Sequence, residues 1–528
     1  MPARPRTPPP KGPRMPAPRE PLALVPRPLK LARRFGSFAL GPGTAVRIAP
    51  GAEGAASLLR ELLTPATGFP LPAAPDGEII LALDPALGGT GEEGYGLTVA
   101  PDAVLLRAAR PAGLLHGVQT LRQLLPAEAL LPGAVRAERW ELPCVEITDR
   151  PLLPRRGFMI DVARHFQPVS WLRRLVDLLA LHKLNVLQLH LTDDQGWRMP
   201  VPALPRLTEI GGVRAETLGD GVPHGGAYST AELRGLVAYA EARGVEIVPE
   251  IEVPGHTRAA IAAYPHLGND PARTLPVWTR WGVCDTVLGM GEESLDFVRT
   301  VLDEVMDVFP SRHVHVGGDE CPSTEWHHSP SALNRVRTER LPGPDALRGW
   351  FLGQVGRHLA AHGRVPFGWS ENGTDLPPGF TVLPWRDTDH GLAAARRGHR
   401  VITSAYRTSY LDYPQHPGPG EPPGQPGLLT LRQVYEADPV PPGWEPEAAR
   451  QVVGRQAALW SEYAPTPAHL EYLAFPRLTA LAERAWSPRR DWDDFGARLT
   501  RHRLRLDALG VRGADRFSDT PPTGEETG

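Results

Sequence analysis

The sequence predicts an α/β fold, a (β/α)8 TIM barrel preceded by a small α+β domain. From Arg156 onward, short β-branched and apolar runs alternate with helical patterns. Several of these runs open into acids, histidine or tryptophan, as strands do when they converge on one face of a barrel. The alternative is an open doubly wound sheet, which a Gly-rich turn after the first strand would favour. The sequence has no such turn there.

At 528 residues the chain is too long for one ordinary core. We predict four segments, which are a disordered Pro-rich leader at 1–20, the small α+β domain at 21–150, the catalytic barrel at 151–512 and a disordered tail at 513–528. In the small domain we expect strands at 44–48, 78–83, 95–99 and 104–108, and a helix at 112–125.

Eight strands are expected in the barrel, and their runs lie at 157–162, 185–191, 245–248, 313–316 and 365–369 and near Val382, Val401 and Ala458. Helical spacing of apolar residues predicts helices at about 172–182, 293–308 and 346–362. Ser229 and Glu232 form a capping-box pattern at the start of another helix, and Gly244 suits its end.

The composition of the chain argues against some classes of binding partner. The net charge of −3 argues against nucleic-acid and membrane-surface binding, which usually need a strong basic excess. Three scattered cysteines predict neither a disulfide framework nor a structural metal site. We expect no cofactor and no catalytic metal. No apolar secretion segment and no apolar run of about 20 residues is visible, so we predict a cytoplasmic protein.

The central motif of the sequence lies at residues 312–320. Val314 and Val316 alternate with histidines, as in a short strand, and Gly317 and Gly318 then let the backbone turn. Asp319 and Glu320 follow at once. The carboxyl end of a barrel strand is where such folds place their chemistry.

Other strand ends repeat this arrangement. We expect these residues to gather near one mouth: Arg156, Asp161, Asp193, Asp194, Glu250, Glu252, His256, Asp319, Glu320, Trp369, Trp385, Tyr410, Asp412, Trp460 and Glu462. Aromatic rings cover the apolar face of a pyranose, while carboxylates and arginine bind its hydroxyls. The pattern therefore favours a sugar site with carboxylates for proton transfer.

The adjacency of Asp319 and Glu320 constrains the mechanism. Retaining glycosidases usually place a nucleophile and an acid about 5 Å apart across the bond. Neighbours on one strand point to opposite sides, so only a bend would turn both toward a substrate. One possibility is that one carboxylate is the acid and the other steadies a nucleophile that belongs to the substrate.

Four ordered segments, at 156–166, 190–198, 249–256 and 315–320, resemble glycoside hydrolase family 20, the β-N-acetylhexosaminidases. Residues 113–121 resemble the amino-terminal domain of that family. The resemblance implies an exo-acting retaining enzyme that removes terminal β-linked N-acetylglucosamine or N-acetylgalactosamine. The 2-acetamido oxygen would attack C1 and form an oxazolinium intermediate.

The same resemblance assigns roles. Glu320 would be the general acid and then the base, and Asp319 would orient the acetamido group. The sugar-binding residues would be Arg156, Trp369, Trp385, Tyr410, Asp412, Trp460 and Glu462, with Asp193 and His256 paired behind them. One departure is visible, because Gln456-Ala457 stands where the family commonly has Glu-Ala.

Two other classes stay open at this point. A metal-dependent barrel hydrolase would use a His-x-His strand end, and His313 and His315 have that spacing. A catalytically silent carbohydrate-binding protein is the third class, although both acids are intact. The preferred epimer, the natural glycan and the oligomeric state are not readable from the sequence.

Overall fold

Eight parallel strands close into a barrel in the computed structural model, which describes residues 22–133, 135 and 137–514. The first strand, β7, pairs with the last, β18, so the sheet has no edge and the doubly wound alternative is excluded. The predicted fold class is confirmed. The strands are β7 (Arg155–Asp161), β8 (Val186–His190), β13 (Glu246–Glu250), β14 (His313–His315), β15 (Val365–Ser370), β16 (Thr381–Pro384), β17 (Val401–Thr403) and β18 (Val452–Leu459).

Helices form the outer layer. The principal ones are α3 (Val169–Leu181), α5 (Thr230–Glu241), α7 (Glu292–Val308), α9 (Leu347–Ala361), α10 (Thr388–Arg396), α12 (Leu431–Glu436), α14 (Pro467–Ala474) and α15 (Arg477–Trp486). The predicted capping box at Ser229 and Glu232 is present at the start of α5. Between β15 and β16 the connection at 371–380 is a loop, where an ideal (β/α)8 barrel has a helix. Among the described residues, no helix is long and apolar enough to cross a membrane.

Shorter elements lie in the connections. They are β9 (Thr192–Asp193), β10 (Gly196–Trp197), α4 (Arg206–Glu209), β11 (Val213–Arg214), β12 (His224–Gly225), α6 (Arg258–Ala263), η3 (Pro265–Leu267), α8 (Pro330–Thr338), η4 (Pro344–Ala346), α11 (Tyr406–Ser409) and α13 (Pro446–Ala449). The Pro/Gly-rich segment at 414–427 forms no helix or strand.

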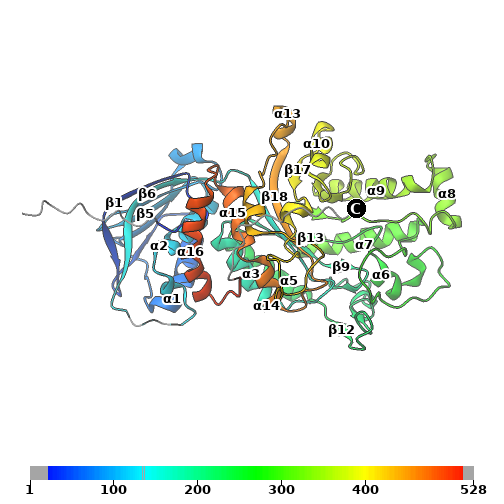
Figure 1. Cartoon of the computed structure of the whole chain (residues 1–528), viewed down its shortest axis with the longest axis horizontal. Coiled ribbons are helices and arrows are strands. Elements are labelled where there is room, and N and C mark those ends of the chain that lie inside the picture. Colours follow the sequence, from blue (N-terminus) through cyan, green and yellow to red (C-terminus); the bar gives the residue numbers. More distant parts are fainter. Residues whose placement is uncertain (1–21, 134, 136, 515–528) are drawn as a thin grey trace, which may run out of the picture.

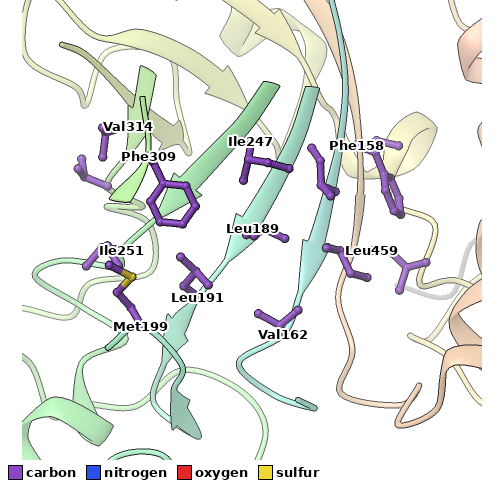
Figure 2. Close-up of a cluster of buried hydrophobic side chains, with 14 of the residues drawn as sticks. Phe158, Val162, Leu189, Leu191, Met199, Ile247, Ile251, Phe309, Val314 and Leu459 are labelled. Atoms are coloured by element: carbon purple, nitrogen blue, oxygen red, sulfur yellow. The ribbon is translucent and has the colours of Figure 1, made fainter. Parts of the chain in front are cut away.

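The barrel core lies between strands and helices, and Figure 2 shows part of it. Phe158, Leu189 and Ile247 extend from three neighbouring strands, and Val314 and Phe309 belong to the same cluster. All five are at most 4% exposed, which explains why the strands read as continuous apolar runs. Apolar strand residues therefore fill the space between the barrel and the helices around it.

The small domain is one mixed sheet covered by two helices (Figure 1). The strand order is β1-β6-β4-β5-β3-β2. The elements are β1 (Lys30–Leu40), β2 (Val46–Ile48), α1 (Glu53–Thr67), β3 (Ile79–Leu83), η1 (Pro85–Thr90), β4 (Tyr95–Val99), β5 (Val104–Ala108), α2 (Pro111–Leu124), η2 (Ala127–Leu130) and β6 (Trp140–Asp149). The strands predicted at 95–99 and 104–108 are confirmed as β4 and β5, which pair as an antiparallel hairpin. Strands β1 and β6 and helix α1 were not predicted.

Buried charges join the two domains. Lys183, just after α3, contacts Asp149 at the end of β6 at 2.9 Å, and Trp486 donates its indole N–H to the same carboxylate. The last helix, α16 (Trp492–Ala508), lies beside the small domain (Figure 1). Its Arg498 donates to the carbonyl of Leu24 as well as to Glu483 in α15. The last helix of the predicted barrel segment therefore also belongs to the domain interface. The predicted leader at 1–20 and most of the predicted tail lie outside the described residues.

Replacing Arg498 with alanine should lower the free energy of unfolding by about 3–5 kcal/mol, because it leaves the Glu483 carboxylate buried and unpaired. The two side chains are 4% and 1% exposed. Urea denaturation followed by circular dichroism measures the change. The control is Arg432→Ala, which breaks an exposed pair with Glu436 and should cost under about 1 kcal/mol. Equal losses in the two variants would contradict this account of the interface.

Candidate active site

A cavity of about 570 Å³ opens at the carboxyl ends of the barrel strands. Its walls come from the segments that follow β7, β8, β13, β14, β16, β17 and β18. The lining residues are Arg164, His190, Asp193, Glu252, His256, Asp319, Glu320, Trp385, Arg386, Asp387, His390, Tyr406, Tyr410, Asp412, Tyr413, Gln425, Trp460 and Glu462. The fold thus brings acids and aromatic rings together at one mouth of the barrel, as we predicted from the residues at the strand ends.

The turn after β14 carries the two adjacent acids. Gly317 and Gly318 have φ of +60° and +95°, and Glu320 itself has φ of +44°, so the strand direction is lost at once. A Cβ at Gly317 would lie 1.6 Å from Oε2 of Glu252, so only glycine fits. Because of this bend, Asp319 and Glu320 both line the cavity instead of facing opposite sides.

Nine of the eleven predicted site residues line the cavity: Asp193, His256, Asp319, Glu320, Trp385, Tyr410, Asp412, Trp460 and Glu462. The expected pairing of Asp193 with His256 is present, at 3.2 Å. The individual roles of these residues stay predictions.

The placement of Arg156 in the sugar site is wrong. Arg156 lies near the amino end of β7, the end opposite the cavity, and it is fully buried. Its guanidinium binds Glu93 of the small domain at 2.7 and 2.8 Å. Burial raises the pKa of Glu93, but the Arg156 cation outweighs this and holds that pKa well below its usual range. Arg156 therefore joins the two domains.

Arg164 takes the place that Arg156 was expected to fill. It follows the carboxyl end of β7, contacts Asp193 at 2.9 Å and lies 5.1 Å from the ring of Trp460. Arg164 also contacts Asp161 at 3.3 Å and so belongs to a buried ion-pair network. Strand direction was the signal that could have identified it, because Arg164 comes after the strand and Arg156 comes at its start.

The prediction that Trp369 lines the sugar site is also wrong. It is fully buried beneath Trp460, with ring centroids 6.0 Å apart, and is not among the lining residues. Its indole N–H donates to Glu250 at 2.6 Å. The indole of Trp369 therefore holds the buried Glu250 carboxylate in place and packs beneath Trp460, which lines the cavity.

Beneath the cavity, histidines and carboxylates alternate. His190 lies 2.9 Å from Asp193 and 2.9 Å from Glu250, and His256 lies 3.1 Å from Asp194. Burial lowers the pKa of both histidines, but their carboxylate neighbours outweigh it and raise each pKa well above its usual range. Both imidazoles are therefore cations at neutral pH.

The carboxyls that face the cavity are perturbed in the opposite direction. Burial raises the pKa of Asp319, and burial together with the Asp319 charge raises the pKa of Glu320. The His256 cation lowers both, and its Nε2 lies 3.7 Å from Glu320. One atom from each of these three side chains falls within 4.8 Å of the others. With Asp319 ionised, Glu320 holds its proton at a pH where an ordinary glutamate would not.

Aromatic rings form one wall. Trp385 and Tyr410 are nearly parallel, with centroids 6.4 Å apart, and Trp460 lies 6.1 Å from Tyr410. Burial, followed by the charges of Asp319 and Asp412, raises the pKa of the Tyr410 phenol well above its usual value. The hydroxyl therefore stays protonated and can donate a hydrogen bond.

Several buried polar atoms at the cavity have no hydrogen-bond partner among the described residues. They are Oε1 of Glu252, Oδ1 of Asp319, Nε1 of Trp385, Oδ1 of Asp412 and Oε2 of Glu462. A polar ligand with several hydroxyls would satisfy them.

Gln456, which stands where the family commonly has a glutamate, takes part in a chain of hydrogen bonds between side-chain amides. Gln456 donates to Oε1 of Gln188, and Gln188 donates to Glu250, at 2.9 and 2.8 Å. The missing carboxylate is therefore replaced by a neutral hydrogen-bonded pair.

The geometry does not favour the metal alternative that was based on His313 and His315. His313 contacts Glu246 near the amino end of the barrel, while His315 contacts Glu250 near the carboxyl end. Neither belongs to the groups of described residues whose spacing could hold an ion. The groups next to the cavity instead consist of paired histidines and carboxylates.

Together, a barrel, a cavity at its carboxyl end, an adjacent pair of acids and an aromatic wall define a glycoside hydrolase. The family models agree: residues 154–489 match the catalytic domain of glycosyl hydrolase family 20, and residues 22–150 match domain 2 of that family. The chain belongs to glycosyl hydrolase family 20.

Relatives extend the comparison. A β-hexosaminidase of Porphyromonas gingivalis is 38% identical over 92% of this chain, which spans 64% of that protein's length. One from Akkermansia muciniphila is 38% identical over 78% of this chain and 83% of its own length. The solved exo-β-N-acetylglucosaminidase of Vibrio harveyi, in complex with N-acetylglucosamine, has a TM-score of 0.86 and 33% identity, covering 95% of this chain and 80% of that chain.

A variant of the Streptomyces plicatus β-hexosaminidase in complex with its product, GlcNAc, is also similar. It has a TM-score of 0.83 and 33% identity, covering 95% of this chain and 98% of that chain.

Replacing Gly317 with alanine should lower kcat/KM by more than about 100-fold, because the new Cβ displaces Glu252 and with it the turn that carries both acids. Steady-state kinetics on an aryl glycoside measures the change. Gly349→Ala in α9 is the matched control, since nothing lies within 4 Å of its new Cβ. Normal activity in the Gly317 variant would show that the turn tolerates a side chain.

Proposed function

We propose that this chain is an exo-acting, retaining β-N-acetylhexosaminidase that removes terminal N-acetylglucosamine or N-acetylgalactosamine by substrate-assisted catalysis. The observation that carries the proposal is the adjacency of Asp319 and Glu320 on one bent strand end. The β-hexosaminidase relatives and the N-acetylglucosamine complexes of similar structures support the same reaction.

The adjacent acids suit a nucleophile supplied by the substrate. A conventional retaining pair flanks the scissile bond, whereas these two acids approach a sugar from one side. Glu320, the more accessible of the two, donates its proton to the glycosidic oxygen as the C1–O bond breaks. The acetamido oxygen attacks C1 from the other face and closes the oxazolinium ring.

Asp319 and Tyr410 hold the acetamido group. The Asp319 carboxylate accepts the amide N–H and offsets the positive charge that develops on it, and its free Oδ1 supports this role. The Tyr410 hydroxyl donates to the acetamido oxygen and aims it at C1. Glu320, now ionised, takes a proton from water, which attacks C1 and regenerates the sugar with its original configuration.

The remaining residues bind the sugar. Trp385 and Trp460 lie against the pyranose, and Arg164, Asp412 and Glu462 reach its hydroxyls. The cytoplasmic location and the absence of a metal requirement stay predictions, and unchanged activity in a chelator would support the second of these.

Replacing Glu320 with glutamine should reduce hydrolysis of an N-acetyl-β-glucosaminyl disaccharide by about 10²–10⁴-fold, because the leaving group loses its proton donor. A dinitrophenyl glycoside, whose leaving group needs no proton, should lose less in the bond-breaking step, which the initial burst of dinitrophenol reports. Glu339→Gln on the surface is the control. Near-normal turnover of the disaccharide by the Glu320 variant would refute the assigned acid.

The alkaline limb of kcat/KM should follow the pKa of Glu320, with activity falling as pH rises through that raised value. The His256 cation lowers this pKa, so His256→Asn should move the limb to higher pH. Asparagine tolerates the backbone of residue 256, where φ is +51°. His327→Asn on the surface should leave the profile unchanged. A limb that stays in place or moves to lower pH in the His256 variant would contradict the assignment.

A further inference from the structure

A second cavity, of about 650 Å³, lies at the amino end of the barrel, opposite the cavity with the two acids. It opens where β7, β14, β15, β16, β17 and β18 begin, so its residues lie before these strands or in their first residues. The lining residues are Pro154, Arg155, Arg312, His313, Val365, Phe367, Gly379, Phe380, Thr381, Gly398, His399, Arg400 and Val453. We call this hollow the basal cavity.

Basic groups dominate the basal cavity. Three arginines and two histidines line it, and no aspartate or glutamate does. The side chains of Arg312 and Arg400 are exposed, and within the described part of the chain neither has an ion pair or a side-chain hydrogen bond. The rim of the basal cavity therefore presents two free guanidinium groups.

Arg155 adds a third, deeper cation. Its Nη1 lies 3.1 Å from His313, and the guanidinium contacts Glu246 at 3.0 Å. Its Nε and Nη2 are buried and have no partner among the described residues. Glu246 therefore neutralises one edge of Arg155 and leaves the other edge without an acceptor.

What distinguishes the basal cavity is that three arginines line a single hollow. Several exposed arginines elsewhere lie beside a carboxylate, as Arg396 does beside Glu445 and Arg450 beside Glu447, whereas Arg312 and Arg400 do not among the residues that the structure describes. Glu246 neutralises these cations only in part, so the arginines repel one another, and an anion in the hollow relieves this repulsion. Guanidinium groups bind phosphate oxygens in a bidentate manner, and three of them suit a dianion better than a single carboxylate.

Apolar groups line the rest of the basal cavity. The ring of Phe367 lies under the guanidinium of Arg155, at 5.2 Å, and Phe380 and Val365 add further carbon surface. A hollow of this volume is large enough for a small organic molecule and much larger than a free phosphate ion. The combination fits an ester with a charged end and an organic end.

We propose that the basal cavity binds a small phosphate ester, with the phosphate between Arg312 and Arg400 at the rim and the organic part against Phe367 and Phe380. The site shares no lining residue with the candidate active site, so the proposal stands independently of the proposed reaction.

Isothermal titration of the purified chain with glucose 6-phosphate, inorganic phosphate and glucose tests the proposal. We expect the ester to bind more tightly than either inorganic phosphate or glucose, and binding to weaken as salt is raised. Absence of ester binding at millimolar concentration would overturn the proposal. Inorganic phosphate binding as tightly as the ester would overturn the placement of an organic part.

The matched variants are Arg312→Gln/Arg400→Gln and, as a control for lost charge, Arg47→Gln/Arg337→Gln at exposed positions elsewhere. The first pair should weaken ester binding at least tenfold, and the second should not change it. Hydrolysis of an aryl glycoside should stay normal in both, which shows that the fold is intact. Equal binding by both variants would mean that the ester binds elsewhere.

Discussion

The candidate site depends on the contact between Glu252 and the turn at Gly317 and Gly318. The Glu252 carboxylate occupies the space where any side chain at Gly317 would lie, and it accepts the backbone N–H of Gly318 at 3.2 Å. That contact ends β14 abruptly and turns Asp319 and Glu320 into one cavity. Without the bend, alternation along the strand would separate the two acids, and no joint action on one sugar would be available.

The electrostatics of the site fall into two layers. In the lower layer, His190 and Glu250 are paired with one another and with further partners, so their charges are fixed. In the upper layer, Glu252, Asp319 and Glu320 crowd together, and burial raises the pKa of each. The fixed layer therefore supports an upper layer in which a proton can move, which is the requirement for an acid that later acts as a base.

Sequence alone predicted the barrel because its strands are buried on both sides and read as continuous apolar runs. It missed β6 in the small domain, where Pro143 interrupts the strand pattern, and β1, which is largely exposed. The two acids could be predicted from their position after a strand. The distinction between Arg156 and Arg164 could not be drawn from residue type, because it depends on which end of β7 each one occupies. The hydrogen bond from Trp369 to buried Glu250 likewise has no signature in the sequence.

The central claim is that the amide of the sugar is the nucleophile. Its most direct test is the rate of hydrolysis of aryl glycosides whose N-acetyl group carries zero, one, two or three fluorines, because fluorine weakens the carbonyl oxygen as a nucleophile and leaves the glycosidic bond in place. The account predicts a steep, progressive fall in kcat/KM along the series. A rate that does not change with fluorination would contradict it and would point to a nucleophile on the protein.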